Sequence, residues 1–199
     1  GNTGAVNFLI LGFAIGLTGG LGICISQSFG SGDKEKMRRE IAMSVVICLT
    51  VGVVVTIISL LGMRPIFVFL QTPEDMLDTT LKYFGVILVG TTVSVFNNFA
   101  MTLLRSVGNS KVPLYAMVMS SGINIILDLI FVFPLRMGVF GAALATVLAQ
   151  VFSMIYCYLH IRAIGSLIPQ KSEWKLRPEI LSRLIGKGLP VAVMNSVTA

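Results

Sequence analysis

The chain has 199 residues, of which 55% are hydrophobic and only 12% are Asp, Glu, Lys or Arg. Soluble domains usually carry about a quarter charged residues, so this composition excludes an ordinary cytosolic enzyme, a disordered chain and a disulfide-rich secreted scaffold. An integral membrane protein remains, and the positions of the charged residues decide its organisation.

Five long segments contain almost no charged residue. A helix of roughly 20 apolar residues crosses the hydrocarbon core of a bilayer, and each segment is at least that long. The runs are continuous, whereas the strands of a membrane barrel would alternate apolar and polar residues. We therefore predict an all-α, polytopic transmembrane helix bundle with five spans, at about Ala5–Phe29, Ile41–Gly62, Tyr83–Leu104, Pro113–Phe133 and Val139–Leu159.

Local sequence patterns add detail to the prediction for the first three spans and the connections between them. Glycine recurs every fourth residue in the first span, at Gly12, Gly16 and Gly20, and this spacing predicts close packing against another helix. The apolar stretch at 63–70 is too short to cross again, so we expect it to lie at the outer membrane interface. Thr72 is a candidate N-cap for the third helix.

The part of the chain after the fifth span is more polar. Trp174 and an apolar stripe on a predicted helix indicate an amphipathic helix that lies on the cytoplasmic membrane surface; the stripe consists of Ile180, Leu181, Leu184 and Ile185. A new apolar run begins at Leu189. We predict a transmembrane bundle at 1–161, a cytoplasmic amphipathic linker at 162–188 and the truncated start of a further transmembrane helix at 189–199.

The basic residues indicate the orientation of the bundle. Of the 15 Lys and Arg residues, four lie in the connection 30–40, two in 105–111 and six in 162–187. Basic residues collect in cytoplasmic loops, so these alternate connections are predicted to face the cytoplasm. Because the basic residues flank membrane spans and do not form a surface with base-stacking aromatic residues, nucleic acid is not a predicted partner.

No catalytic or cofactor motif occurs in the sequence. It lacks a GxxxxGK[ST] phosphate loop, an HExxH pair and any Cys/His spacing that suits a metal. Cys24, Cys48 and Cys157 lie far apart within predicted spans, and His160 is the single histidine. We therefore predict a protein that is not an enzyme and has no resident metal or cofactor.

Asp128 is the one ionisable residue placed well inside a predicted span. A carboxylate near the bilayer centre costs about 2.5–3.5 kcal/mol on insertion scales, and such residues usually face a bundle interior or an aqueous cavity. Asn124 lies four residues earlier, on the same helix face. The pair can offer carboxylate and carbonyl oxygens to a cation or hold a proton. The alternative is that Asp128 only hydrogen-bonds a polar neighbour and stabilises packing.

Other polar residues within the spans are weaker candidates. Asn97 and Asn98 are adjacent, so they point to different helix faces, and one of them can line a cavity while the other locks a helix pair. Thr146 and Gln150, four residues apart, are expected to share a face.

Four separate segments resemble motifs of the MATE (multidrug and toxic compound extrusion) family. Residues 25–33 read ISQSFGSGD, similar to the family's SQxxGAGD turn, and residues 104–113 read LRSVGNSKVP, similar to its LRGxGxxKxP turn. Ser106 replaces the first glycine of that second motif. The segments NIILD at 124–128 and GVFGAALAT at 138–146 complete the resemblance, which extends over essentially the whole chain.

The resemblance implies a MATE-like first lobe. The five spans would be helices two to six of a twelve-helix, two-lobe antiporter, and 189–199 would start helix seven. Members of the family exchange organic, often cationic, drugs for Na⁺ or H⁺. By the same resemblance, Asn124, Asp128 and Thr146 would bind the coupling cation or proton. The drug cavity would be lined by Asn98, Met117 and, as a further candidate, Gln150.

The sequence thus predicts part of a cation-coupled multidrug efflux antiporter, a multi-pass protein of the cell (inner) membrane. Its expected partners are small, cationic, drug-like substrates, the lipid bilayer and the remaining half of the same transporter, with Na⁺ or H⁺ as coupling ion and no other cofactor. One alternative is a lipid-linked sugar flippase of the same superfamily, although no basic residue lies within a predicted span. The other alternative is a membrane scaffold that transports nothing.

Overall fold

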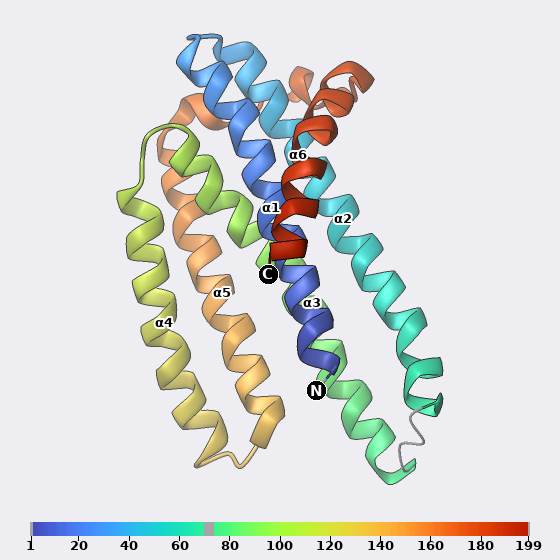
Figure 1. Ribbon diagram of the computed structural model, residues 1–199. Coiled ribbons are helices and arrows are strands. Elements are labelled where there is room, and N and C mark those ends of the chain that lie inside the picture. The colour runs from blue at the N-terminus through green and yellow to red at the C-terminus, as the bar shows by residue number, and fades with distance from the viewer. Residues whose placement is uncertain (1, 70–73, 199) are drawn as a thin grey trace.

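The computed structural model describes the backbone of residues 2–69 and 74–198, and the side chains of residues 12–13, 15–57, 85 and 90–195. Within this part of the chain there is no strand; it folds into long α-helices and two short 3₁₀ helices, η1 and η2 (Figure 1). In chain order these are α1 (Asn2–Gly30), α2 (Lys34–Phe69), α3 (Glu74–Ser106), α4 (Lys111–Val132), α5 (Gly138–Ala163), η1 (Gly165–Leu167), η2 (Lys171–Trp174) and α6 (Pro178–Thr198).

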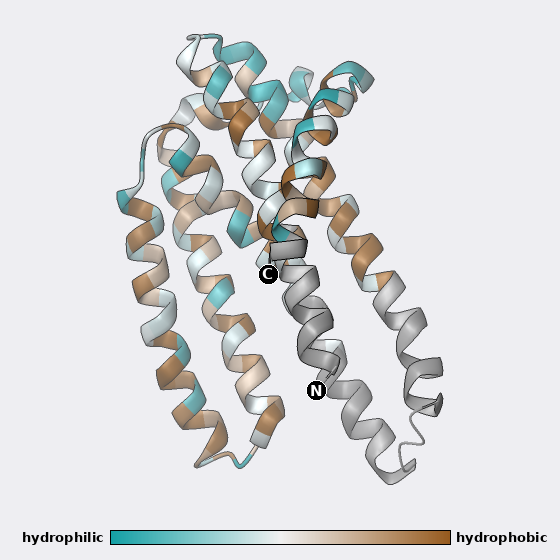
Figure 2. Ribbon diagram, viewed as in Figure 1, coloured by the Kyte–Doolittle hydropathy of each residue, from teal (hydrophilic) through white to brown (hydrophobic). Residues whose placement is uncertain are grey.

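The predicted all-α bundle is confirmed, and each predicted span lies almost entirely within one of the first five helices. Three stretches with described side chains are long and apolar enough to cross a membrane: Lys34–Ile57, Lys111–Val132 and Gly138–Ala163. Helices α1 and α3 are 29 and 33 residues long, so each can also cross roughly 30 Å of hydrocarbon. The hydropathy colouring shows polar residues gathered at the end where α1 meets α2 (Figure 2).

The second helix is longer than predicted. The structure continues α2 as far as Phe69, so residues 63–69 extend the second helix, and their place at the outer membrane interface stays a prediction. A helix satisfies its own backbone N–H and C=O groups, which an irregular segment in contact with lipid does not. Continuing the helix therefore costs less free energy. The predicted N-cap Thr72 lies outside the described residues.

The core is divided between two clusters. The larger one joins α1, α2, α3 and α6 around fully buried side chains such as Leu21, Ile25 and Leu184. The smaller one joins α3, α4 and α5 around Leu104 and Cys157. Helices α4 and α5 lie side by side at one flank of the bundle, while α6 crosses α1 at the other (Figure 1).

Glycine lets α1 and α6 approach closely, as predicted from the spacing in the first span. A Cβ atom added to Gly16 would lie 2.5 Å from the Cα of Ala192, and one added to Gly20 would lie 2.5 Å from the Cα of Gly188. Real Cβ atoms do not approach a neighbouring backbone that closely. Any side chain at these glycines would therefore push the two helices apart.

Helix α6 carries the predicted apolar stripe. Leu184 in this stripe is fully buried, and Ile180 and Leu181 pack against the larger core cluster, although Ile185 remains 40% exposed. The stripe therefore packs mainly against other helices of this chain, and its place on the cytoplasmic membrane surface stays a prediction. Helix α6 also crosses the predicted boundary between 162–188 and 189–199 without a break. The division into bundle, linker and further helix stays a prediction.

Candidate functional site

The predicted cation residues lie on the facing helices α4 and α5. Small residues recur at every fourth position of α5, and they are buried. This small-residue face allows close packing; a Cβ on Gly141 would lie 2.9 Å from the Cβ of Phe131 on α4. The sequence thereby brings the polar positions of the two helices within contact. The buried residues of this face are Gly141, Ala145, Ala149, Ser153 and Cys157.

A hydrogen bond joins two of the three predicted cation-site residues. The amide Nδ2 of Asn124 on α4 donates to the Oγ1 of Thr146 on α5, at 3.3 Å. The Thr146 hydroxyl in turn donates to the backbone carbonyl of Ala142, at 3.0 Å. Since the nitrogen of the Asn124 amide makes this contact, its carbonyl oxygen is left as an acceptor for another group.

Asp128 lies one helical turn after Asn124 on the same side of α4, and its side chain is half-buried. Its Oδ1 atom is shielded from solvent and accepts no hydrogen bond from any described residue. A buried polar atom without a partner costs free energy, and such atoms are uncommon in native proteins. Asp128 therefore has an oxygen that a cation or proton can satisfy, beside an amide that can add a second oxygen.

The predicted substrate residues are only partly brought together. On α3 the Nδ2 of Asn98 donates to the backbone carbonyl of Ser94, at 2.9 Å. The hydroxyl of the same Ser94 donates to the Oε1 of Gln150 on α5. Asn98 and Gln150 thus meet through Ser94, whereas Met117 lies on α4, is 50% exposed and is not part of this network.

The two adjacent asparagines of α3 face different surroundings, as predicted. Asn97 is buried and its Oδ1 has no hydrogen-bond partner among the described residues. Asn98 is half-buried and hydrogen-bonds the preceding turn. The sequence reasoning missed Ser94, which is 5% exposed. The spacing of Ser94 and Asn98, four residues apart on a helix, could have identified it.

A second group of polar side chains lies at the end of the bundle where α1, α2 and α6 meet. Glu40 is only 1% exposed. The hydroxyl of Ser28 on α1 donates to its Oε2 at 2.7 Å, and Arg183 on α6 lies 3.9 Å from its Oε1. Lys187 on α6 donates to the side chain of Gln27 at 2.7 Å. These contacts connect α6 to the first two helices.

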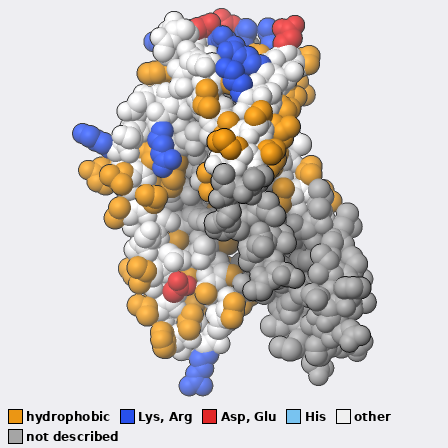
Figure 3. All heavy atoms as spheres, in the orientation of Figure 1, with side chains coloured by type: hydrophobic (Ala, Val, Ile, Leu, Met, Phe, Trp, Pro, Cys, Tyr) orange, Lys and Arg blue, Asp and Glu red, His pale blue; other side chains and the backbone are white. Residues whose placement is uncertain are grey.

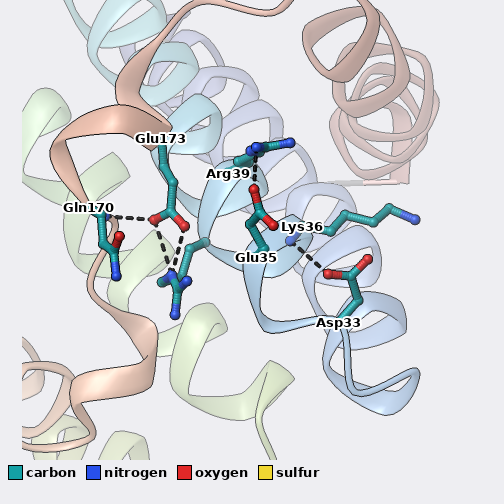
Figure 4. Close-up of polar contacts among 7 residues, drawn as sticks. Asp33, Glu35, Lys36, Arg39, Gln170 and Glu173 are labelled. Carbon is teal, nitrogen blue, oxygen red and sulfur yellow. Dashed lines mark hydrogen bonds and ion pairs between the residues drawn. The ribbon is translucent and has the colours of Figure 1, made fainter.

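Glu173 connects the segment before α6 to α2. The Nε of Arg38 donates to both of its carboxylate oxygens, at 2.9 and 3.0 Å, and the backbone N–H of Gln170 donates to Oε2 (Figure 4). Burial opposes the ionisation of Glu173, but these donors outweigh it and lower its pKa below the ordinary value. The carboxylate is therefore a fully paired structural group.

The sequence analysis had not singled out Glu40 or Glu173. Glu40 was assigned to a loop, yet Met37, Ser44 and Ile47 are buried at helical spacing around it. This pattern extends the buried face of α2 toward its N-terminus and could have shown that Glu40 is buried. Among the side chains that the structure describes, no group of three His, Cys, Asp or Glu residues could hold a metal ion.

Comparisons with known proteins agree with this architecture. The sequence model of the family described as MatE matches residues 3–130, more than half of the chain. The probable multidrug resistance protein YoeA of Bacillus subtilis is 26% identical over 94% of the chain and 42% of its own length. The multidrug export protein MepA of Staphylococcus aureus is 25% identical over 88% of the chain and 39% of its length.

A solved structure has the same fold. It is the inward-facing conformation of a multidrug resistance MATE family transporter of the MOP superfamily, with a TM-score of 0.85 and 29% sequence identity. The alignment covers 97% of this chain and 45% of that protein. The chain thus spans less than half the length of the relatives it matches.

Proposed function

This chain belongs to the MatE family, and from that premise we propose that it forms part of a cation-coupled multidrug efflux antiporter of the cell membrane. In a transporter of its relatives' length, it would exchange small, cationic, drug-like compounds for Na⁺ or H⁺. The names of the relatives, a multidrug resistance protein and a multidrug export protein, support the substrate class.

The observation that carries the proposal is the buried, unpartnered Oδ1 of Asp128 beside Asn124. A cation at this place would gain a carboxylate oxygen and the amide oxygen of Asn124, and hard cations prefer such oxygen ligands. A proton on Asp128 would instead remove the charge and give the carboxyl group a donor. Either occupant offsets the cost of an unpaired acid inside the bundle.

Coupling requires that the ion binds one conformation of the transporter better than the other. The Asn124–Thr146 hydrogen bond spans α4 and α5, so the oxygens available next to Asp128 depend on how these two helices are placed. An ion bound there stabilises one placement of α4 against α5. A helix movement that separates Asn124 from Thr146 weakens ion binding, and ion binding in turn opposes that movement.

The substrate is proposed to contact Asn98, Gln150 and Met117. Amide groups can hydrogen-bond varied organic compounds, and the flexible thioether of Met117 adapts to different shapes. Asn98 and Gln150 are linked by Ser94 across α3 and α5. Because α5 also carries Thr146, it would be shared between the ion residues and the substrate residues.

The test replaces Asp128 by Asn in the full-length transporter, reconstituted in liposomes with an imposed pH or Na⁺ gradient. We expect loss of gradient-driven efflux of a fluorescent cationic drug, because an amide neither ionises nor exchanges a proton. Glu179→Gln is the matched control, since it removes one exposed acid from α6. Gradient-dependent efflux by Asp128→Asn at the wild-type rate would show that the assignment is wrong.

A second variant identifies the coupling ion. Thr146→Val keeps the shape of the side chain but removes the hydroxyl that holds Asn124. If Na⁺ is the coupling ion, the Na⁺ concentration for half-maximal efflux should rise, because the amide oxygen is no longer held in place. If H⁺ alone drives transport, Na⁺ should have no effect in either protein.

A further inference from the structure

A cavity of about 790 Å³ lies at the cytoplasmic end of the bundle, away from the candidate ion site. Its walls come from α2, α3 and α5, and residues 167–169 with η2 form its roof. The walls are apolar, with Ile41 from α2, Phe99 and Ala100 from α3, and Ile155 from α5. This volume is in the range of cavities that bind small organic ligands, which are about 300–1,000 Å³.

Polar groups converge on one part of this apolar cavity. Tyr158 and Arg162 of α5 and Trp174 of η2 line it, and all three side chains are exposed. Among the described residues, none makes a hydrogen bond or ion pair with the Tyr158 hydroxyl, the Arg162 guanidinium or the Trp174 indole N–H. Each of these groups is a hydrogen-bond donor, so the mouth of the cavity holds donors without a protein acceptor.

The charge at the mouth is positive and is not neutralised by the protein. The nearest acid along the chain to Trp174 is Glu173, and Arg38 already binds both of its carboxylate oxygens. Arg162 has no acidic partner among the described residues, and the exposed Lys171 and Lys175 lie in the segment on either side of Trp174. The space-filling view shows Lys and Arg side chains, with Asp and Glu side chains among them, at the end of the molecule where α1 meets α2 (Figure 3).

With the basic connections on the cytoplasmic side, as the sequence predicts, the cavity would lie at the level of the cytoplasmic leaflet. Tyr and Trp are enriched where the membrane meets water, because an apolar ring can enter the lipid while its polar group stays wet. Arg162 lies in the last turn of the apolar helix α5. In such a position the stem of an arginine can lie in lipid while its charge reaches the headgroups. The occupant must therefore carry a long apolar part and an anionic, hydrogen-bond-accepting end.

We propose that this cavity binds an anionic phospholipid of the cytoplasmic leaflet, with an acyl chain between α2, α3 and α5 and its phosphate at Arg162. Trp174 and Tyr158 would donate to the ester or phosphate oxygens. Basic pockets between transmembrane helices on the cytoplasmic side are known to bind anionic lipid headgroups. The Arg38–Glu173 contact holds the segment that carries Trp174 and so keeps the roof of the site in place.

The test uses the full-length transporter in vesicles that contain phosphatidylglycerol or phosphatidylcholine with brominated acyl chains. Bromine quenches tryptophan fluorescence on contact, and the signal of Trp174 is obtained as the difference between wild type and Trp174→Phe. We expect stronger quenching by brominated phosphatidylglycerol than by brominated phosphatidylcholine at equal mole fraction. Arg162→Gln should lower the relative affinity for phosphatidylglycerol about fivefold, the effect of one basic residue near the membrane surface.

The matched control is Arg177→Gln, which removes the same charge from an exposed residue that does not line the cavity. It should leave the preference for phosphatidylglycerol unchanged. An equal loss of the preference for phosphatidylglycerol in both variants would show that the lipid is attracted to the basic surface as a whole, and it would overturn the proposed site. Quenching that is absent with both lipids would also overturn it, because another part of the protein or a second copy would then fill the cavity.

Discussion

The carboxylates at the two ends of this structure have opposite surroundings. At the end where α1, α2 and α6 meet, Glu173 and Glu40 are almost completely buried, and each has protein donors within hydrogen-bond distance. Between α4 and α5, Asp128 is only half-buried, yet its Oδ1 has no donor among the described residues. Burial alone therefore does not distinguish Asp128 from the two glutamates. The absence of a protein partner at its Oδ1 does, and it is this difference that supports the proposed ion-binding role.

The two regions also differ in how many helices pack together in each. The end where α1, α2 and α6 meet joins these helices and the segment between α5 and α6 through a shared core and four polar contacts. Helix α4, in contrast, buries few side chains, among them Val112 and Ala116 in its first turns. Helix α4 packs closely on α5 but contacts the other helices little, so it could shift against the rest of the bundle while the paired end holds the other helices together.

The largest expected effect comes from breaking the paired end. Glu173→Ala leaves Arg38, which is 19% exposed, without its partner, and losing one member of a buried pair costs about 3 kcal/mol or more. We expect a lower thermal denaturation midpoint of the purified transporter. Glu179→Ala, at an exposed acid close by in the sequence, is the control. Equal midpoints for Glu173→Ala and the wild type would show that this contact does not stabilise the end.

Gly16→Val should have the next largest effect. The added side chain would meet the backbone of Ala192 on α6, and overpacking of this kind costs about 1–3 kcal/mol. The measurement is again the denaturation midpoint. Gly19→Val is the control, because a Cβ at Gly19 meets nothing within 4 Å. Equal destabilisation by the two variants would contradict the close contact of α1 and α6.

Lowering the pH should reduce the difference in denaturation midpoint between the wild type and Glu173→Gln. The folded-state pKa of Glu173 is lower than its ordinary value of 4.5, so its ionised form stabilises the folded protein. This stabilisation is complete above about pH 4.5 and is lost as the pH falls through the lower, folded-state pKa. Midpoints measured from pH 7 to pH 3 should therefore converge only below 4.5. Convergence near neutral pH would argue against the pairing.

The smallest effect on stability is expected for Asp128→Asn, although its effect on transport should be large. Asp128 has no protein partner at Oδ1 to lose, so the denaturation midpoint should change by the equivalent of about 1 kcal/mol or less. Comparing the denaturation midpoints of Asp128→Asn and Glu173→Ala tests whether an acid without a protein partner contributes less to stability than a paired one. A loss of stability as large as that of Glu173→Ala would assign Asp128 a packing role.

Much of the architecture follows from local sequence patterns. The charge-free runs predict where the helices lie, because the bilayer accepts only long apolar segments with satisfied backbones. The glycine spacing at Gly16 and Gly20 predicts a close helix contact, but it does not say that the partner is α6. Likewise, the spacing of Asn124 and Asp128 places them on one face, but only the structure pairs Asn124 with Thr146.

Where a local pattern fits more than one arrangement, contacts distant in sequence decide between them. The stripe around Leu184 has the pattern of a helix at a membrane surface, yet the same pattern suits packing on α1 and α2. The periodicity of a helix shows which face is apolar and not what covers that face. Glu40 was overlooked for a similar reason, since a charge next to a basic loop resembles a solvated residue.

By itself, the sequence determined the class of molecule, its helices and the single acid inside a predicted span, because hydrophobic length and charge position act locally along the chain. Only the tertiary structure decided which acids have partners, which helices touch and where an apolar cavity with unpaired donors forms. Those properties depend on side chains from helices that are far apart in sequence, as Arg38 and Glu173 are.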